Sequence, residues 1–239
     1  MSCFFRQGDI HTLIKTVPDN SVDLIYQDPP FHTTKNNWDE QLQWKLLFAE
    51  YFRILKPTGM LVIHCSIPFN YELIRSAPKP PSYSWYWNKQ AVTCPLIANQ
   101  QPLRCMEEVL VWRKQYNTYY RQNVGTEKRT VSFMKPTEYY GNTVSGNSIL
   151  TGKTRTHLLE MERHADAKAG APKKGQKRVK NYVTRSEEMI ELFLKHYTKE
   201  GDVVLDPTCY KGLTGKVAKR LKRRFIGFDK HFLPTELMV

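Results

Sequence analysis

The segment Asp28-Pro29-Pro30-Phe31 brings together three groups that could act on an amino group attached to an aromatic ring. It follows residues 22–27, a mostly apolar run, so the carboxylate, a proline carbonyl and the ring stand at the end of a predicted strand. The lone pair of such an amino nitrogen is delocalised into the ring. A carboxylate and a carbonyl that accept its two N–H hydrogens would expose that lone pair, and two rigid prolines would position both acceptors. A strand that merely ends at Pro-Pro, with Phe31 in the core, is the simpler interpretation of this segment alone.

A second segment, residues 203–229, has the pattern of a nucleoside-binding turn. One apolar strand ends at Asp206, a turn with Gly212 and Gly215 leads into a helix, and a second strand ends at Asp229. In doubly wound folds this spacing places a nucleotide-type ligand over the first turn and an acid at its ribose. The turn has neither a GxGxxG nor a Walker sequence, which favours a nucleoside without a pyrophosphate, such as S-adenosylmethionine. An ordinary strand–helix turn would explain the pattern equally well.

The elements that must position these groups alternate between strands and helices. The periodicity predicts strands at residues 3–9, 22–27, 59–66, 83–90, 107–114, 202–208 and 224–230, and helices at residues 10–21, 42–57, 186–201 and 213–223. This rhythm predicts a parallel sheet covered by helices. Four of the predicted strands finish on an acid, namely Asp9, Asp28, Asp206 and Asp229. Because ligands of parallel sheets bind beyond the carboxyl ends of the strands, these acids are candidate site residues.

The composition is that of a globular protein with an excess of positive charge. The 239 residues include 36 Lys and Arg against 23 Asp and Glu, which gives a formal net charge of +13. Such a charge favours a polyanionic partner, nucleic acid before membrane, although it would also serve solubility alone. The five cysteines form no CxxC pair, and no apolar run is long enough to span a bilayer. We therefore expect reduced thiols and an intracellular, cytoplasmic protein with no membrane partner.

The ordered set of motifs resembles the β-group amino-methyltransferases of DNA, which modify adenine N6 or cytosine N4. Five segments carry the resemblance over nearly the whole chain: "QGDIHTLIKTVPDNSVDLIYQDPPF", "FRILKPTGMLVI", "QPLRCMEEVLVWRK", "KNYVTRSEEMIELFLKHYT" and "DVVLDPTCYKGLTGKVAKRLKRRFIGFDK". The resemblance implies a Rossmann-like, S-adenosylmethionine-dependent methyltransferase fold with a mostly parallel α/β sheet and helices on both faces. It also implies a circularly permuted motif order, because the catalytic motif precedes the cofactor motif.

The resemblance assigns roles by position in this sequence. The catalytic residues would be Asp28, Pro29, Pro30 and Phe31, and the Phe31 ring would stack on a base taken out of the duplex. The cofactor would be bound by Asp9, Ile10, Asp28, Thr184, Asp206, Thr208, Gly212, Thr214, Asp229 and Lys230. DNA would be bound by Lys35, Lys153, Arg155, Lys173, Lys174, Lys177 and Arg178. No metal is implied. We expect a single methyltransferase domain, residues 1–239, in which residues 116–180 form a basic, irregular target-recognition insertion.

The chain departs from the family pattern in three segments. Tyr210 and Lys211 stand in the cofactor turn where the family has small residues, so we expect Tyr210 to crowd the turn and weaken cofactor binding. Met106 stands where related sequences often have His. In the segment that is expected to close the cofactor pocket, Val183, Arg185 and Ser186 replace the common Pro, Glu and Lys. These departures concern cofactor affinity more than they concern the fold.

The predicted activity is methyl transfer from S-adenosylmethionine to adenine N6 of a flipped-out base at a specific double-stranded DNA site. Cytosine N4 is the close alternative, and an Asp rather than a Ser at position 28 favours adenine. A non-catalytic nucleic-acid-binding protein on the same fold is a second alternative, and structured RNA is a weaker choice of substrate. Methylation at cytosine carbon 5 is excluded, since it needs a cysteine after a proline and Cys94 precedes Pro95. A homodimer and a cognate restriction endonuclease are further partners that the resemblance allows, in a bacterial, phage or viral context.

Overall fold

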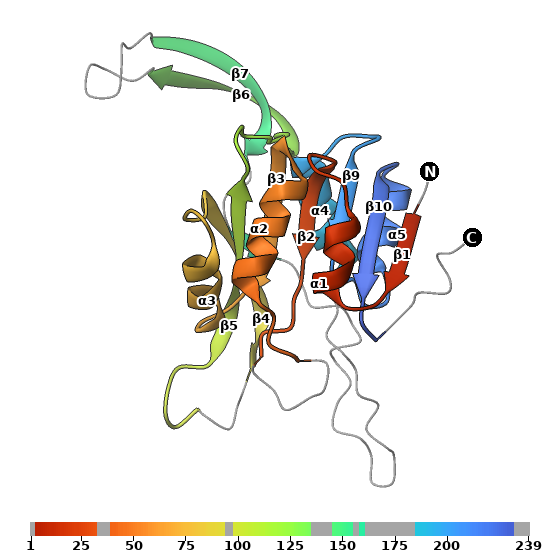
Figure 1. Ribbon diagram of the computed structural model, residues 1–239. Helices are drawn as coiled ribbons and strands as arrows, with labels where there is room; N and C mark the ends of the chain where they lie inside the picture. The colour runs from red at the N-terminus through yellow and green to blue at the C-terminus, as the bar shows by residue number, and fades with distance from the viewer. Residues whose placement is uncertain are drawn as a thin grey trace, which may run out of the picture. The chain divides into compact units, whose positions relative to one another are not determined.

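The computed structural model describes residues 3–32, 39–93, 98–134, 145–154, 158–160 and 185–231. The chain divides into two compact units (Figure 1). The larger unit consists of Met1–Tyr120 and His157–Val239, and the smaller unit of Arg121–Thr156. None of the described helices is both long enough and apolar enough to cross a membrane.

An eight-stranded sheet forms the centre of the larger unit, with the strand order β1-β10-β9-β2-β3-β5-β4-β8. Its strands are β1 (Cys3–Gln7), β2 (Val22–Gln27), β3 (Leu55–Cys65), β4 (Tyr83–Thr93), β5 (Arg104–Arg113), β8 (Leu158–Glu160), β9 (Val203–Asp206) and β10 (Arg224–Asp229). The strands from β1 to β3 in this order are parallel, and so are β4 and β8. Strand β5 runs antiparallel to both of its neighbours. The mostly parallel α/β sheet predicted from the sequence is confirmed.

Helices cover both faces of this sheet (Figure 1). The helices on one face are α1 (Ile10–Leu13), α2 (Trp44–Ile54) and α3 (Phe69–Ser76), and those on the other face are α4 (Glu187–Tyr197) and α5 (Leu213–Arg220). Each face has its own apolar core, because successive residues of a buried strand point to opposite sides. In β2, for example, Ile25 packs in the first core while Leu24 and Tyr26 pack in the second.

The helix boundaries follow local signals in the sequence. The Ser186 hydroxyl accepts a hydrogen bond from the Met189 N–H at 3.2 Å, which begins α4 at the residue where a cap was predicted. The predicted helix at residues 10–21 is shorter than expected, since α1 passes into a 3-10 turn, η1 (Ile14–Thr16). Helix α3 was not predicted. It spans eight residues and buries Phe69 and Leu73 alone, which is too short an apolar pattern to stand out.

The strand order creates a switch point between β9 and β2. The chain leaves β9 through α5 and returns at β10 on one side, whereas it leaves β2 through α2 and returns at β3 on the other side. Ligands of doubly wound folds bind beyond the carboxyl ends of strands at such a point. Asp206 ends β9, and Asp28 follows β2. Since β2 precedes β9 in the chain, the candidate catalytic strand precedes the candidate cofactor strand, in the permuted order that was predicted.

The smaller unit corrects one expectation from the sequence. Residues 116–180 were expected to be irregular, but β6 (Asn123–Met134) and β7 (Ser145–Thr154) form an antiparallel pair, with Thr130 opposite Ile149. Glycine and charged residues interrupt any apolar alternation in both strands, so the usual signal of a half-buried strand is missing. Pairing between two distant backbones forms these strands, and periodicity within one segment cannot detect such pairing.

Candidate active site

The candidate catalytic segment begins where β2 ends. Strand β2 is almost entirely buried between β9 and β3, and Asp28 is the first residue after it. Pro29 and Pro30 have no backbone N–H to donate, so the ladder ends at this point. The Thr208 hydroxyl, in the turn after β9, donates a hydrogen bond to the backbone oxygen of Asp28 at 3.3 Å. This bond connects the candidate catalytic strand end to the candidate cofactor strand end across the switch point.

Phe31 is partly buried next to this segment. Its ring stacks on the ring of Phe69 in α3, with the ring centroids 5.1 Å apart and the planes 23° apart. The following residue, His32, donates its backbone N–H to Asp39 Oδ1 at 2.6 Å, which ties the chain before residue 33 to the chain after residue 38. Packing on Phe69 accounts for one face of the Phe31 ring. Stacking of this ring on a target base stays a prediction.

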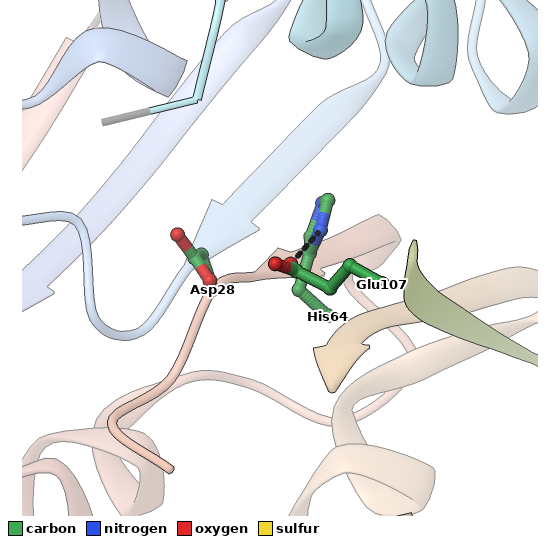
Figure 2. Close-up of side chains that lie close together, drawn as sticks. All are labelled: Asp28, His64 and Glu107. Atoms are coloured by element: carbon green, nitrogen blue, oxygen red, sulfur yellow. Dashed lines mark ion pairs between the residues drawn. The ribbon is translucent and has the colours of Figure 1, made fainter. Parts of the chain in front are cut away.

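Three ionisable side chains from different strands converge next to the catalytic segment (Figure 2). Asp28 follows β2, His64 lies in β3 and Glu107 lies in β5. One carboxylate oxygen of each acid and one ring nitrogen of His64 all lie within 4.8 Å of one another. Two carboxylates at this distance favour a cation between them. The guanidinium of Arg185 is that cation, since its Nη2 lies 2.6 Å from Asp28 Oδ1 and also pairs with Glu107 Oε1. A side chain of the protein itself therefore forms ion pairs with both carboxylates.

Burial and ion pairing determine the charges in this cluster. Burial alone would raise the pKa of Glu107, but the Arg185 charge and the contact with His64 outweigh it and lower that pKa to about 2. Burial and the Arg185 charge lower the pKa of His64 from its ordinary value. The hydroxyl of Tyr26 lies 2.8 Å from His64 Nε2. At neutral pH the cluster thus contains an ionised Glu107, a cationic Arg185 and an uncharged imidazole.

The candidate cofactor strand ends on a buried acid. Asp206 is 4% exposed, and its two oxygens accept hydrogen bonds from the Thr214 hydroxyl at 2.6 Å and the Thr208 N–H at 3.1 Å. Burial raises the pKa of Asp206 to about 7, the hydrogen bonds oppose this rise, and the negative charges of Asp28 and Asp229 add to it. The carboxylates at the switch point therefore repel one another in the free protein, and a cationic ligand would relieve that repulsion.

The turn after β9 adopts backbone conformations that are normally reserved for glycine. Gly212 has a φ of 75° and Tyr210 a φ of 46°, both in the left-handed region. For a residue with a side chain this conformation costs roughly 1–2 kcal/mol. The Tyr210 N–H donates to Asp229 Oδ2 at 2.8 Å, and the His231 N–H donates to Asp229 Oδ1 at 2.8 Å. The turn thus forms despite Tyr210. That Tyr210 weakens cofactor binding stays a prediction.

Other predicted cofactor residues lie at the neighbouring strand end. Asp9 follows β1 and caps α1 by accepting a hydrogen bond from the His11 N–H at 2.9 Å. Ile10 is buried at the start of that helix. Because β1 pairs with β10 and the Gly8 N–H donates to the Asp229 carbonyl at 2.9 Å, the chain leading to Asp9 lies next to the end of β10. The ammonium group of Lys230 pairs with the exposed carboxylate of Glu40 at 2.6 Å.

Several predicted residues lie outside the described part of the chain. They are Thr184 of the cofactor set and Lys35, Arg155, Lys173, Lys174, Lys177 and Arg178 of the DNA-binding set. Lys153 lies in β7 of the smaller unit. The roles of all these residues stay predictions.

Sequence reasoning missed the buried polar cluster around Asp28. Arg185 was noted only as a departure from the family pattern, and Glu107 and His64 were assigned no role. The one local signal is a charged or polar residue inside an apolar strand, as His64 is in "LVIHC" and Glu107 is before "VLVW". Such a residue is expensive to bury without a partner, so it indicates a buried pair. The partner's identity is not encoded locally.

The fold and the site together define a class of protein. A doubly wound sheet carries one strand end with an acid, two prolines and an aromatic ring. The adjacent strand, β9, ends at Asp206 and is followed by a turn that contains Gly212. The next strand in the sheet, β10, ends at Asp229. This arrangement is typical of doubly wound proteins that bind a nucleoside-type ligand beyond the strand ends.

Comparison with known proteins identifies the family. Residues 22–232 match the sequence profile of the N6/N4 methyltransferase family, which is described as DNA methylase, and the chain belongs to this family. It is 25% identical over 235 residues to the Type II methyltransferase M.BamHI of Bacillus amyloliquefaciens, covering 93% of this chain and 53% of that enzyme. It is 26% identical over 245 residues to the DNA adenine methyltransferase YhdJ of Escherichia coli (strain K12), covering 93% of this chain and 76% of that enzyme. The chain thus spans about half the length of the Bacillus relative.

Solved structures have the same fold. The complex of M1.HpyAVI with SAM aligns with a TM-score of 0.59 at 19% identity, over 99% of this chain and 96% of that one. The cytosine-N4-specific PvuII DNA methyltransferase aligns with a TM-score of 0.62 at 18% identity, over 95% of this chain and 81% of that one. The family and the methyltransferase fold inferred from the sequence motifs are confirmed.

Proposed function

We propose that this protein transfers a methyl group from S-adenosylmethionine to N6 of an adenine in double-stranded DNA. The observation that carries the proposal is the position of Asp28 at the switch point. Its backbone oxygen is hydrogen-bonded to Thr208 of the cofactor turn, so an amino group bound by the catalytic segment would lie next to the cofactor. Membership of the DNA methylase family and the name of the Escherichia coli relative support DNA and adenine.

The catalytic segment provides two hydrogen-bond acceptors. The Asp28 carboxylate and the Pro29 carbonyl would accept the two N–H hydrogens of the target amino group, which draws its nitrogen toward tetrahedral geometry and exposes the lone pair. The two prolines keep the acceptors rigid, so little reorganisation is needed. The cofactor, when bound, supplies an electrophilic methyl group on a sulfonium. The amine itself would be the nucleophile: its nitrogen would form a bond to the methyl carbon while the bond from that carbon to the sulfonium sulfur breaks, which leaves a neutral thioether. The methylated nitrogen would then lose one hydrogen as a proton to solvent, and no covalent enzyme intermediate is required.

The described residues fit this cofactor. S-adenosylmethionine carries an ammonium and a sulfonium charge, and the acids Asp28, Asp206 and Asp229 surround the switch point. Burial raises the pKa of Asp206 to about 7 and the charges of Asp28 and Asp229 add to this rise, so a cationic ligand next to that strand end would stabilise the ionised carboxylate. The turn has no Walker sequence, in keeping with a nucleoside that carries no phosphate. The SAM complex of M1.HpyAVI, on the same fold, supports this choice of cofactor.

Cytosine N4 remains the second candidate target, because the same two acceptors suit both amino groups and the PvuII enzyme of the same fold is cytosine-N4-specific. Asp28, in place of a serine, favours adenine. We further propose a specific duplex site and an intracellular location where DNA is accessible. The Type II relatives support a cognate restriction endonuclease, and a homodimer is a further proposal.

The test measures transfer of a labelled methyl group to duplex DNA, followed by identification of the modified nucleoside by mass spectrometry. We expect N6-methyladenine. Asp28→Ala should lower the transfer rate at least about 100- to 1,000-fold while the cofactor still binds. Asp19→Ala is a matched control, because Asp19 is exposed and precedes β2 at the opposite end of the strand. N4-methylcytosine would select the second candidate. No cofactor binding with or without DNA would indicate a non-catalytic nucleic-acid-binding protein.

A further inference from the structure

Arg185 occupies a central position next to the candidate catalytic carboxylate. It lies immediately before the Ser186 cap of α4 and is 9% exposed. Its guanidinium carbon lies 5.2 Å from the centroid of the Trp87 ring, and Trp87 is the cross-strand partner of Glu107. The guanidinium thus rests on an aromatic face and contacts two carboxylates, Glu107 and Asp28. Stacking and ion pairing of this kind fix a planar guanidinium in one orientation.

The two carboxylates that contact Arg185 differ in their surroundings. The Glu107 side chain is 6% exposed and also lies 3.7 Å from Lys89 Nζ and 3.6 Å from His64 Nδ1. The Asp28 side chain is 32% exposed. Glu107 is therefore the buried anchor of the guanidinium, and Asp28 is the partner that stays accessible from outside the core. Burial would lower the pKa of Arg185, but Asp28 and Glu107 raise it, so the guanidinium stays charged.

Only one oxygen of Asp28 is used by this contact. Arg185 Nη2 donates to Oδ1 at 2.6 Å, and within the described ranges of the chain no hydrogen bond reaches Oδ2. An aspartate with two free oxygens can rotate about its Cβ–Cγ bond and present either one. With Oδ1 bound to a fixed guanidinium, the plane of the carboxylate is set. Oδ2 is then left to accept a hydrogen from the target amine.

We propose that Arg185 is a positioning residue for methyl transfer, which orients the Asp28 carboxylate and is itself anchored by Glu107. The inference rests on the proposed function, because it assumes that Asp28 accepts a hydrogen bond from the amine. It gives a physical role to the position at which this chain departs from the family's common Glu. Arg185 acts through Asp28, so its loss should lower the rate of the bound complex rather than the affinity for the cofactor.

The test compares Arg185→Ala and Arg185→Lys in the full chain, with methyl transfer to duplex DNA as the readout. Arg185→Ala should lower kcat about 100-fold and leave the KM for S-adenosylmethionine within about threefold. Arg185→Lys retains the positive charge but loses the planar guanidinium with its several N–H donors, and its kcat should fall about tenfold. The Ala variant leaves a guanidinium-sized space over Trp87. Added guanidinium chloride at millimolar concentration should therefore restore much of the activity, whereas equal sodium chloride or urea should not.

Each result decides between positioning and the other roles of Arg185. Ala-variant activity equal to or above that of the unmodified protein would show that Arg185 is dispensable or blocks the amine site, and would overturn the proposal. A loss that appears only in KM, or that guanidinium does not restore in a protein with an unchanged melting profile, would also overturn it. If Arg185→Ala does not fold, Arg185→Lys decides by the same split between kcat and KM. Failure of the proposed function is distinct, since the unmodified protein would then transfer no methyl group.

Discussion

Protonation of Asp206 should make cofactor affinity depend on pH. This carboxyl is buried and its pKa is raised to about 7, so below that pH the folded protein holds a proton on the acid nearest the switch point. A ligand that carries an ammonium and a sulfonium group binds better to the ionised carboxylate. Binding should therefore release a proton, and affinity should fall as the pH falls through 7.

The size of the effect follows from the ionised fraction. With a pKa of about 7, Asp206 is about 9% ionised at pH 6 and about 91% ionised at pH 8. If only the ionised form binds, affinity rises about tenfold between these values, which is about 1.4 kcal/mol. The cofactor's own α-amino group titrates at about 7.7–8.0 and opposes this rise at the upper end. A matched variant is therefore needed to isolate the contribution of Asp206.

Isothermal titration calorimetry with S-adenosylmethionine at pH 6, 7 and 8 provides the measurement. Two buffers of different ionisation enthalpy will reveal the number of protons released. Asp206→Asn retains an oxygen for the Thr214 hydroxyl but cannot titrate, so its affinity should be lower and should show only the pH dependence of the cofactor. If the unmodified protein and the variant show the same ratio of affinities between pH 8 and pH 6, Asp206 does not couple to the cofactor and the reasoning is refuted.

Two further predictions concern the fold and DNA binding. A Cβ at Gly215 would lie 2.8 Å from ring atoms of Phe225 and Phe5. Gly215→Ala should therefore lower the free energy of unfolding by about 1–3 kcal/mol, despite the better helix propensity of alanine. Denaturant melts that show equal or greater stability would contradict this. Replacing Lys173, Lys174 and Lys177 by Gln should reduce the salt slope of DNA binding by about 2.7. Lys222→Gln, in the turn that precedes β10 at the end away from Asp229, should leave the slope unchanged. An unaltered slope in the triple variant would remove these lysines from the DNA interface.

Much of the site could be predicted because its signals are local. Asp28, Asp206 and Asp229 each end an apolar run, and the rule that ligands bind beyond parallel strand ends then brings them together. The Ser186 cap and the buried stripe of α2 are equally local, since a helix start depends on one hydrogen bond and its face on a 3.6-residue period.

Only the tertiary structure revealed the surroundings of the catalytic carboxylate. Arg185 lies 157 residues after Asp28 in the chain, yet its guanidinium contacts that residue and Glu107. Burial of a charge depends on partners from distant strands, and no periodicity in one segment reports them. The β6–β7 pair is similar, because two polar segments become strands by pairing with each other. The sequence alone determined where the acids stand, whereas the packing of distant elements determined which cation orients one of them.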